Sequence, residues 1–373
     1  MTSRTRCAKF LAILSSVLVL GQPLLAAPVR SRSKTTTHTT TKRKATTHRY
    51  LGVPTYANSA LGDVTEFDDP VIREASIKAL GRYNGSVVAI DPQNGRVLSI
   101  VNQKLAFSSG YIPCSTIKPT IALAALQEGV VTRDTMIRVA PRRYMNLTEA
   151  MAHSNNSYFE ELGRRMGFET VSHYAQSLGL GELAGYNIPE EQAGKLPAAP
   201  PVNGGVARMS SFGEGIQMTP LELGALVATV ANGGTMYYLQ YPRSEDAIHA
   251  FEPRVKRQLE IGPYVSDVRD GMEAAVLYGT AKRSFDADET LLGKTGTCSD
   301  QASHVGWFAS YEDEVNPRLV LVILLRGQSS HVKGPFAAGI AGHIYHTLKE
   351  EDYFAKRAAT AAVQHTSQTA TQR

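Results

Sequence analysis

An α+β fold is predicted from the order of strand-like and helix-like segments along the 373-residue chain. A β-rich hairpin pattern, GSVVAIDPQNGRVLSIV over 85–101, stands early, and three further β-rich segments follow residue 290. The sequence between these two groups is mostly helical in its apolar spacing. Strands at both ends of the chain therefore predict one sheet beside a helical part, with a site in the cleft between them.

Residues 1–27 have the pattern of a secretory signal peptide. Basic residues stand near the start, an apolar run covers 10–20, and Ala26 and Ala27 provide a cleavage point. Because the apolar run is short for a membrane span, a cleaved signal peptide is favoured over a retained N-terminal anchor. We therefore expect an exported protein of the periplasm or cell envelope.

Residues 28–65 are expected to form a disordered tether, since 28–50 are basic, rich in threonine and almost without apolar residues. The first 50 residues hold ten Lys and Arg and no acid, whereas the rest of the chain holds 29 bases and 34 acids. Nucleic-acid binding by the folded part is therefore not expected. The tether could be a plain linker, or it could be attracted to an anionic wall or membrane surface.

A folded region over 66–350 is predicted to open with a helix near Glu66. Asp69 is a suitable N-cap, and Pro70 is a suitable first helical residue. The hairpin over 85–101 follows, with a Pro/Asn/Gly turn between its two strands. One face of the helix carries small, mostly apolar side chains: Ile72, Ala75, Ser76, Ala79 and Leu80.

The segment GYIPCSTIKPT, residues 110–120, is the strongest candidate for chemistry. Ser115 and Lys118 are three residues apart at a predicted helix start, so their side chains share one helical face. A lysine can remove the serine proton where burial or a second cation lowers the lysine pKa. Ser31 and Ser330 also precede a lysine by three residues, but only Ser115 opens a long apolar segment.

The later part of the chain continues as helices and then returns to strands. Thr219 is a clear helix N-cap, with proline next and Glu222 at the third helical position. Another helix is expected over 266–280, followed by the strands LLGKTGTCSD, HVGWFASY and RLVLVILL. A last helix and a flexible polar tail are expected at 336–349 and 351–373.

Three further polar segments have no evident place in a core. Ser-Asn-Asn at 154–156 supplies a second hydroxyl and an amide, with a polar turn as the plain alternative. Lys-Thr-Gly-Thr at 294–297 supplies a cation that can lower the pKa of Lys118, two hydroxyls, and a glycine that permits close approach. Its plain alternative is an edge-strand lysine that prevents aggregation. FGEGIQMTP, at 212–220, is a glycine-rich loop before a capped helix.

Ser-x-x-Lys, Ser-x-Asn and Lys-Thr-Gly-Thr occur in this order in penicillin-binding proteins and serine β-lactamases, and the chain resembles that superfamily. The flanking sequences are similar to the transpeptidase domain of penicillin-binding proteins. They are HSNNSYFEELGRRMG, FGEGIQMTPLELGALVATVANGGT, YGTA before LLGKTGT, GWFASY after it, and the hairpin before the serine. The resemblance covers about 67–350 and implies a β-lactamase/transpeptidase-like fold with a five-stranded antiparallel sheet.

By that resemblance, Ser115 is the nucleophile that accepts the acyl group, and Lys118 is its general base. The backbone N–H groups of Ser115 and Thr297 would form the oxyanion hole. Ser154, together with Asn156 and Lys294, would transfer protons and position the substrate. The substrate would contact Thr295, Gly296 and Thr297 of the third motif, with its terminal carboxylate on the two threonines.

The implied substrate is a peptidoglycan stem peptide that ends in D-Ala-D-Ala. Acylation expels the last D-alanine, and an amine of a neighbouring stem then completes a D,D-transpeptidase reaction, whereas water completes a D,D-carboxypeptidase reaction. β-Lactam antibiotics would acylate the same serine. The resemblance implies no cofactor and no metal ion, and it leaves a protein partner open.

Cys114 and Cys298 are the two cysteines that remain after signal-peptide removal. The resemblance sets Ser115 opposite Thr297, so the neighbouring cysteines would lie within the separation of about 4.4–6.8 Å that a disulfide requires. This placement is similar to the disulfide of certain carbapenem-hydrolysing lactamases. Two separate buried thiols are the alternative.

A serine β-lactamase is the alternative function. One lactamase class needs a Glu-x-x-Leu-Asn pattern, and none occurs between Asn156 and Lys294. Another class needs a tryptophan on a loop in the same interval, but the single tryptophan of this chain is Trp307. A non-enzymatic penicillin sensor would need a membrane-spanning signalling region, which the sequence pattern does not predict.

The chain departs from the pattern of cross-linking family members in two respects. Those members usually carry an N-terminal pedestal domain, where a disordered tether is expected here, and glycine is common where this chain has Cys114.

Overall fold

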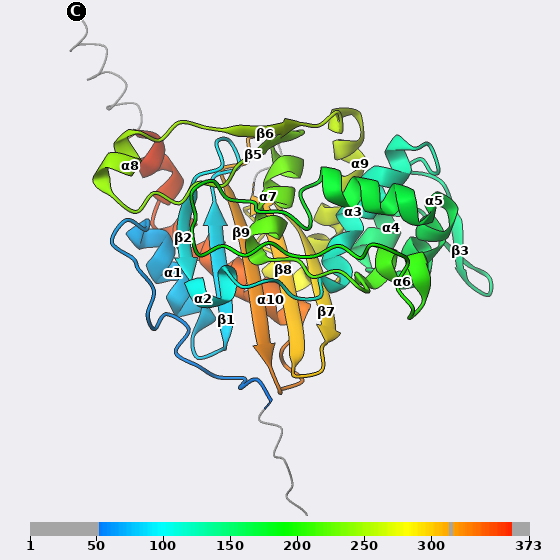
Figure 1. The fold of residues 1–373 in the computed structure, drawn as a ribbon, viewed down its shortest axis with the longest axis horizontal. Helices are drawn as coiled ribbons and strands as arrows, with labels where there is room; N and C mark the ends of the chain where they lie inside the picture. Colours follow the sequence, from blue (N-terminus) through cyan, green and yellow to red (C-terminus); the bar gives the residue numbers. More distant parts are fainter. Residues whose placement is uncertain (1–51, 313–315, 360–373) are drawn as a thin grey trace, which may run out of the picture. The chain divides into compact units, whose positions relative to one another are not determined.

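The computed structural model describes residues 52–312 and 316–359, and Figure 1 shows their arrangement. The predicted signal peptide, most of the predicted tether and the end of the predicted tail lie outside the described residues. Within the described part of the chain, no helix is both long enough and apolar enough to span a bilayer.

A five-stranded antiparallel sheet is the centre of the fold, with the strand order β2-β1-β9-β8-β7. The early hairpin pairs with the last strand, and the first of the late strands forms an outer edge (Figure 1). The predicted α+β class and the predicted composition of the sheet are confirmed. The strands are β1 (Gly85–Ile90), β2 (Val97–Val101), β7 (Leu291–Ser299), β8 (His304–Glu312) and β9 (Leu319–Gly327).

Both faces of the sheet are covered by helices, and this explains why the late strands are continuous apolar runs. In β9, Val320, Val322 and Leu324 belong to one core, and the residues between them belong to the other. One face is covered by α1 (Pro70–Leu80) and α10 (Gly334–Glu350), and the other by α7 (Pro220–Ala231).

The helical part lies beside the β7 edge of the sheet (Figure 1). Its helices are α3 (Lys118–Gln127), α4 (Leu147–Ala152), α5 (Asn156–Ser177), α6 (Gly205–Phe212) and α9 (Gly262–Leu277). The shorter elements are α2 (Gln103–Ala106), η1 (Cys114–Ile117), β3 (Ile137–Ala140), β4 (Arg143–Met145), β5 (Thr235–Tyr237), α8 (Glu245–His249), β6 (Val255–Gln258) and η2 (Lys282–Ser284).

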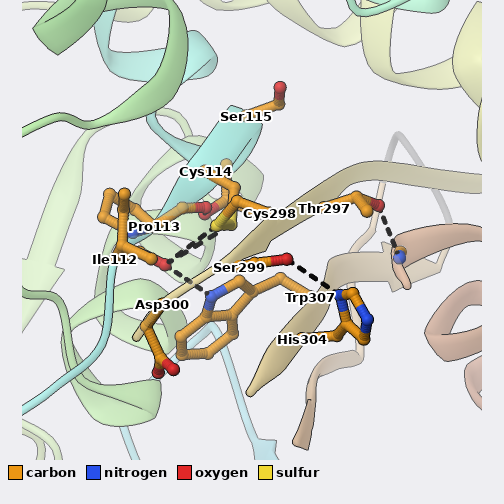
Figure 2. Close-up of a disulfide and its surroundings, with 12 residues drawn as sticks. Ile112, Pro113, Cys114, Ser115, Thr297, Cys298, Ser299, Asp300, His304 and Trp307 are labelled. Atoms are coloured by element: carbon orange, nitrogen blue, oxygen red, sulfur yellow. Dashed lines mark hydrogen bonds between the residues drawn. A yellow bond between two sulfur atoms is a disulfide. The ribbon is translucent and has the colours of Figure 1, made fainter. Parts of the chain in front are cut away.

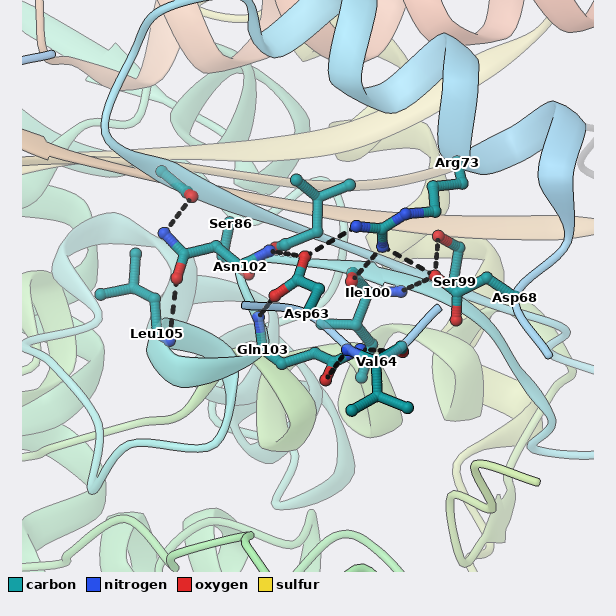
Figure 3. A network of polar contacts seen from close by, with 12 residues as sticks. Asp63, Val64, Asp68, Arg73, Ser86, Ser99, Ile100, Asn102, Gln103 and Leu105 are labelled. Atoms are coloured by element: carbon teal, nitrogen blue, oxygen red, sulfur yellow. Dashed lines mark hydrogen bonds and ion pairs between the residues drawn. The ribbon is translucent and has the colours of Figure 1, made fainter. Parts of the chain in front are cut away.

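The folded region begins before the predicted boundary, so the prediction of a disordered tether is wrong for residues 52–65. Asp63 accepts hydrogen bonds from the backbone N–H groups of Asn102 (2.9 Å) and Gln103 (2.8 Å; Figure 3). It also forms an ion pair with Arg73 at 2.9 Å, and its side chain is 3% exposed. The predicted boundary rests on the helix start at Asp69 and Pro70, and no pattern in the sequence reveals that an aspartate before it is held by distant partners.

The folded region also extends further beyond α10 than the sequence predicts, because residues 353–359 are helical. The Tyr353 hydroxyl donates to the carboxylate of Asp69, the N-cap of α1, at 2.7 Å. Arg357 forms an ion pair with Asp91 at 2.6 Å. The prediction of a flexible tail from residue 351 is therefore wrong for 351–359.

Glu222, in the first turn of α7, fixes a long loop of the helical part. Its carboxylate accepts hydrogen bonds from the backbone N–H groups of Thr219 (2.8 Å), Gly181 (3.0 Å) and Gly194 (2.8 Å). The Thr219 hydroxyl oxygen accepts from Glu222 N–H, which completes the predicted capping box. Burial raises the pKa of Glu222 to about 7, against the three N–H donors that favour the carboxylate.

Replacing Glu222 by alanine is expected to lower the free energy of unfolding by at least about 3 kcal/mol, because each buried N–H left without an acceptor costs roughly 1–3 kcal/mol. Urea unfolding at pH 7 measures the loss. Glu190→Ala is the control, since its half-exposed ion pair with Arg243 contributes at most about 1 kcal/mol. A loss in Glu222→Ala no larger than that of the control would contradict the prediction.

Candidate active site

Ser115 lies where the single turn of η1 continues into α3. Pro119 occupies the first turn of α3, where its missing N–H leaves no helical hydrogen bond unmade. Every residue of α3 before Gln127 is buried, including Lys118. The predicted helix start, with serine and lysine one turn apart on a buried segment, is therefore confirmed.

Lys118 Nζ lies 2.6 Å from Ser115 Oγ. The same nitrogen is 2.7 Å from Asn156 Oδ1 and 3.1 Å from the carbonyl oxygen of Ser154. A neutral lysine amine can donate two hydrogen bonds and accept one. The amide and carbonyl oxygens can take both hydrogens, so the lone pair is left for the hydroxyl of Ser115.

The second motif lies at the junction between α4 and α5. Ser154 has a φ of +54°, a left-handed conformation that is costly for a residue other than glycine. Its hydroxyl oxygen is 2.9 Å from Lys294 Nζ and 3.2 Å from Lys118 Nζ, so this side chain connects the two lysines. Asn155 accepts a hydrogen bond from Tyr158 N–H and caps α5.

The third motif lies within β7 at the edge of the sheet. Lys294 is 1% exposed and extends to Ser154, whereas Thr297 is exposed. A Cβ at Gly296 would lie 2.9 Å from the carbonyl oxygen of Pro113. The close approach that this glycine permits is therefore to the segment that leads into Ser115.

Thr280 is a contact of the third motif that reasoning from the sequence missed. Its Oγ1 lies 2.6 Å from Thr295 Oγ1. Its N–H donates to the carbonyl oxygen of Ala152 at 3.0 Å, so it links the third motif to the segment before Ser154. The tetrapeptide YGTA at 278–281 was the available signal, but its spacing alone assigns the threonine no contact.

The glycine-rich segment 212–220 packs against residues 111–113, the lead-in segment that precedes Cys114 and Ser115. Met218 exchanges two backbone hydrogen bonds with Tyr111, at 2.8 and 2.9 Å. Gly213 has a φ of +72°, and a Cβ there would lie 2.2 Å from the ring of Pro113. This loop therefore helps to hold the chain that precedes Ser115.

Burial is the main reason that both lysines hold their protons weakly. The pKa of Lys118 lies well below its ordinary value, first because of burial and second because of the positive charge of Lys294. Burial lowers the pKa of Lys294 to about 7. Both causes named from the sequence contribute at Lys118, and burial is the larger one.

A disulfide joins Cys114 and Cys298, whose Cα atoms are 5.7 Å apart (Figure 2). The bond ties η1 to β7 directly beside Ser115, across a sequence separation of 184 residues. Trp307 Nε1 donates to the carbonyl oxygen of Ile112 at 3.0 Å and so holds the same lead-in segment from β8. The position of the serine is thus fixed by a covalent bond as well as by packing.

The architecture and the site agree with the class predicted from the sequence, that of penicillin-binding proteins and serine β-lactamases. The sheet has the helical part at its β7 edge, and three polar segments lie beside Ser115. Among the described residues, no three side chains of His, Cys, Asp or Glu gather as a metal site. The model of the penicillin binding protein transpeptidase domain matches residues 85–346. The chain belongs to this family.

Several curated proteins are similar to this chain. Stage V sporulation protein D of Bacillus subtilis (strain 168) is 27% identical over 307 residues, which cover 69% of this chain and 48% of that protein. Peptidoglycan D,D-transpeptidase MrdA of Haemophilus influenzae is 24% identical, with coverage of 72% and 54%. Peptidoglycan D,D-transpeptidase FtsI of Escherichia coli (strain K12) is 22% identical, with coverage of 72% and 52%. The chain spans about half the length of these relatives.

A solved structure shows the same fold. The D,D-transpeptidase domain of a peptidoglycan glycosyltransferase from Eggerthella lenta matches with a TM-score of 0.59 and 18% sequence identity. The match covers 75% of this chain and 81% of that chain. The transpeptidase-like fold implied by the sequence motifs is therefore confirmed.

Reduction of the Cys114–Cys298 bond is expected to slow acylation of Ser115 and to lower stability. The bond closes a long loop, for which chain entropy gives an upper value of roughly 5 kcal/mol. Stopped-flow labelling with a fluorescent penicillin, with and without reductant, measures the change in rate. The variant Cys114→Ala/Cys298→Ala is the control, because its rate should not respond to reductant. Two free thiols per mature chain in unreduced protein, or an unchanged rate after reduction, would contradict the prediction.

Proposed function

We propose that this protein is an acyl-serine D,D-transpeptidase, or a D,D-carboxypeptidase when water is the acceptor, acting on peptidoglycan stem peptides that end in D-Ala-D-Ala. The observation that carries the proposal is the 2.6 Å contact between Lys118 Nζ and Ser115 Oγ, made by a lysine that is fully buried. Two of the three relatives described above are named peptidoglycan D,D-transpeptidases, which supports the same reaction.

In the acylation step, Ser115 Oγ attacks the carbonyl carbon of the penultimate D-alanine. Neutral Lys118 accepts the hydroxyl proton, and the C–N bond to the last D-alanine breaks. Ser154 Oγ lies within hydrogen-bond distance of Lys118 and Lys294, so it can pass a proton to the leaving amine. The product is an ester of Ser115 and free D-alanine.

The remaining residues position the substrate and stabilise the oxyanion. Asn156 orients the peptide amide, and the hydroxyls of Thr295 and Thr297 hold the terminal carboxylate. The backbone N–H groups of Ser115 and Thr297 donate to the oxyanion, and one such donor typically contributes about 2.7–4 kcal/mol. Gly296 keeps the strand close to the lead-in segment, and a β-lactam would acylate the serine in the same way.

The proposal includes export to the cell envelope. The signal-peptide pattern over 1–27 and the basic low-complexity composition that follows support this location. The catalytic domain would then extend from about residue 52 to about residue 359, which are the bounds of the described residues. Stem peptides and β-lactams are the proposed ligands, and nucleic acid is not among them.

Mass spectrometry of the protein after incubation with benzylpenicillin tests the proposal. A long-lived adduct that peptide mapping assigns to Ser115 is the expected result. Rapid loss of the adduct with turnover of the drug would instead indicate a serine β-lactamase. No adduct at any time would contradict both functions.

A further inference from the structure

Two chain segments that meet beside Ser154 hold side chains that the proposed chemistry has not used. Thr280 N–H donates to the carbonyl oxygen of Ala152 at 3.0 Å. A Cβ at Gly279 would clash with the same oxygen, so the two backbones are in direct contact. The chain that leaves α9 therefore packs on the end of α4, immediately before Ser154.

Three side chains join these two segments. Tyr278, which follows the last residue of α9, donates its hydroxyl hydrogen to Glu149 Oε1 at 2.7 Å. Glu149 Oε2 lies 3.4 Å from His153 Nε2, and the centroids of the His153 and Tyr278 rings are 5.9 Å apart. We call Glu149, His153 and Tyr278 the Ser154 brace, because His153 directly precedes Ser154 in the chain.

The backbone of Ser154 needs support from its surroundings. Its φ of +54° is left-handed, and a residue other than glycine keeps that conformation only where the neighbouring structure fixes it. One hydrogen bond inside the turn, from Ser154 N–H to the carbonyl oxygen of Met151 at 3.1 Å, supplies part of this support. The Ser154 brace adds to it by holding the side chain of the preceding residue, His153.

The contact between Tyr278 and Glu149 is suited to a lasting role at neutral pH. Partial burial and the hydrogen bond to Glu149 raise the pKa of Tyr278 to about 12, so the phenol keeps the hydrogen that it donates. All three side chains of the Ser154 brace are close to half exposed, and replacing one of them therefore leaves no cavity in a core.

We propose that the Ser154 brace holds the Ser154 hydroxyl where it can deliver a proton to the leaving amine, which makes Glu149 and Tyr278 positioning residues of the acylation step. This inference rests on the proposed function, in which Ser154 passes that proton. Within the described part of the chain, the brace side chains form no hydrogen bond with Ser115, Lys118 or Lys294. Their effect on the rate is therefore expected to pass through Ser154.

The proton is needed when the C–N bond of the donor breaks. Lys118 takes the hydrogen of Ser115 Oγ, Ser154 Oγ gives its own hydrogen to the departing nitrogen, and Lys118 then returns a proton to Ser154. The ester of Ser115 and a neutral amine are formed without any further reactant. A thiol, with a pKa of about 8.5, can instead leave as the thiolate and does not need this proton.

The test compares two acyl donors on the mature full-length chain with its disulfide intact: benzylpenicillin, whose lactam C–N bond breaks, and a D-alanyl thioester. Tyr278→Phe should lower the acylation rate with benzylpenicillin by about tenfold, a part of the 10²–10⁴-fold that proton transfer typically contributes. Its kcat/KM with the thioester should be almost unchanged. Glu149→Ala should show the same pattern, whereas Glu149→Gln keeps an oxygen that accepts the Tyr278 hydrogen bond and should retain both rates.

Tyr174→Phe is the matched control. Tyr174 makes the same kind of hydrogen bond to a glutamate, Glu128, at 2.7 Å, but at the end of α3 far from Lys118, so both rates should equal those of the wild-type protein. A double variant gives a second check. In Ser154→Ala protein, adding Tyr278→Phe should cause no further loss, because the hydroxyl that the brace positions is already missing.

Equal losses on both donors would mean that the brace supports only the fold, and would overturn the inference. An unchanged rate with benzylpenicillin, or a further loss in the Ser154→Ala background, would overturn it as well. A normal penicillin adduct on Ser115 of the wild-type protein leaves the proposed acylation intact in those cases. Absence of that adduct would overturn the proposed function itself.

Discussion

Replacing Ser115 by alanine is expected to abolish covalent labelling by a fluorescent penicillin. The hydroxyl lies 2.6 Å from the amine of Lys118, and its removal leaves no oxygen at that position to carry the acyl group. Loss of the nucleophile in serine enzymes typically lowers the rate by about 10⁶-fold. In-gel fluorescence after timed incubation measures the labelling, and thermal unfolding checks that the variant is folded.

Ser330→Ala is the matched control for this experiment. Ser330 also precedes a lysine by three residues, but it lies exposed in a turn before α10 and not at the start of a buried helix. Its labelling should equal that of the wild-type protein. Labelling that persists in Ser115→Ala would remove the central claim about the site.

Replacing Lys118 by arginine is expected to lower the acylation rate by about 10²–10⁴-fold, the usual contribution of a general base. Arginine stays protonated and cannot accept the proton of Ser115. Lys118→Met keeps the side-chain length without a charge, so it separates loss of the base from misfitting of a larger cation. Acylation near the wild-type rate in either folded variant would rule out the lysine as the base.

The acylation rate should also fall as the pH is lowered, since protonated Lys118 has no lone pair to offer. Lys118 and Lys294 lie on either side of Ser154, so the acid limb reports apparent values that belong to the pair. Lys294→Gln removes a neighbouring positive charge and should raise the pKa of Lys118, which moves the limb to higher pH. A pH–rate profile of the two proteins measures the displacement, and a limb that moves to lower pH would contradict the assignment.

The parts of the fold that could be predicted depend on signals between residues close in sequence. The Thr219–Glu222 capping box and the Ser115–Lys118 pair each lie within one helical turn, so their residue types reveal their structure. The apolar runs of the late strands similarly reflect burial on both faces of the sheet. Local patterning therefore sufficed for the strands and the main helices, whereas the antiparallel sheet and the joint role of the three motifs came from the family resemblance.

The parts that could not be predicted depend on partners far apart in the chain. Asp63 binds Asn102 across 39 residues, and Tyr353 binds the cap of α1 across 284. Neither residue stands in a pattern that would distinguish it from a solvated polar residue. Such long-range contacts have no signature in a single sequence, so the predicted region, 66–350, is shorter at both ends than the folded region.

The Cys114–Cys298 bond has a further consequence, because it turns the chain between these residues into a covalent ring. The ring encloses the helical part, including a loop where Val202 is fully exposed, whereas β1, β2, β8 and β9 lie on the two arms outside it. A protease that cuts near Val202 would open the ring without releasing a fragment. Such nicked protein should migrate as one chain until it is reduced, and a penicillin label on Ser115 should then follow the N-terminal piece. A cut in this exposed loop would therefore leave Ser115 and Lys294 on one covalent framework.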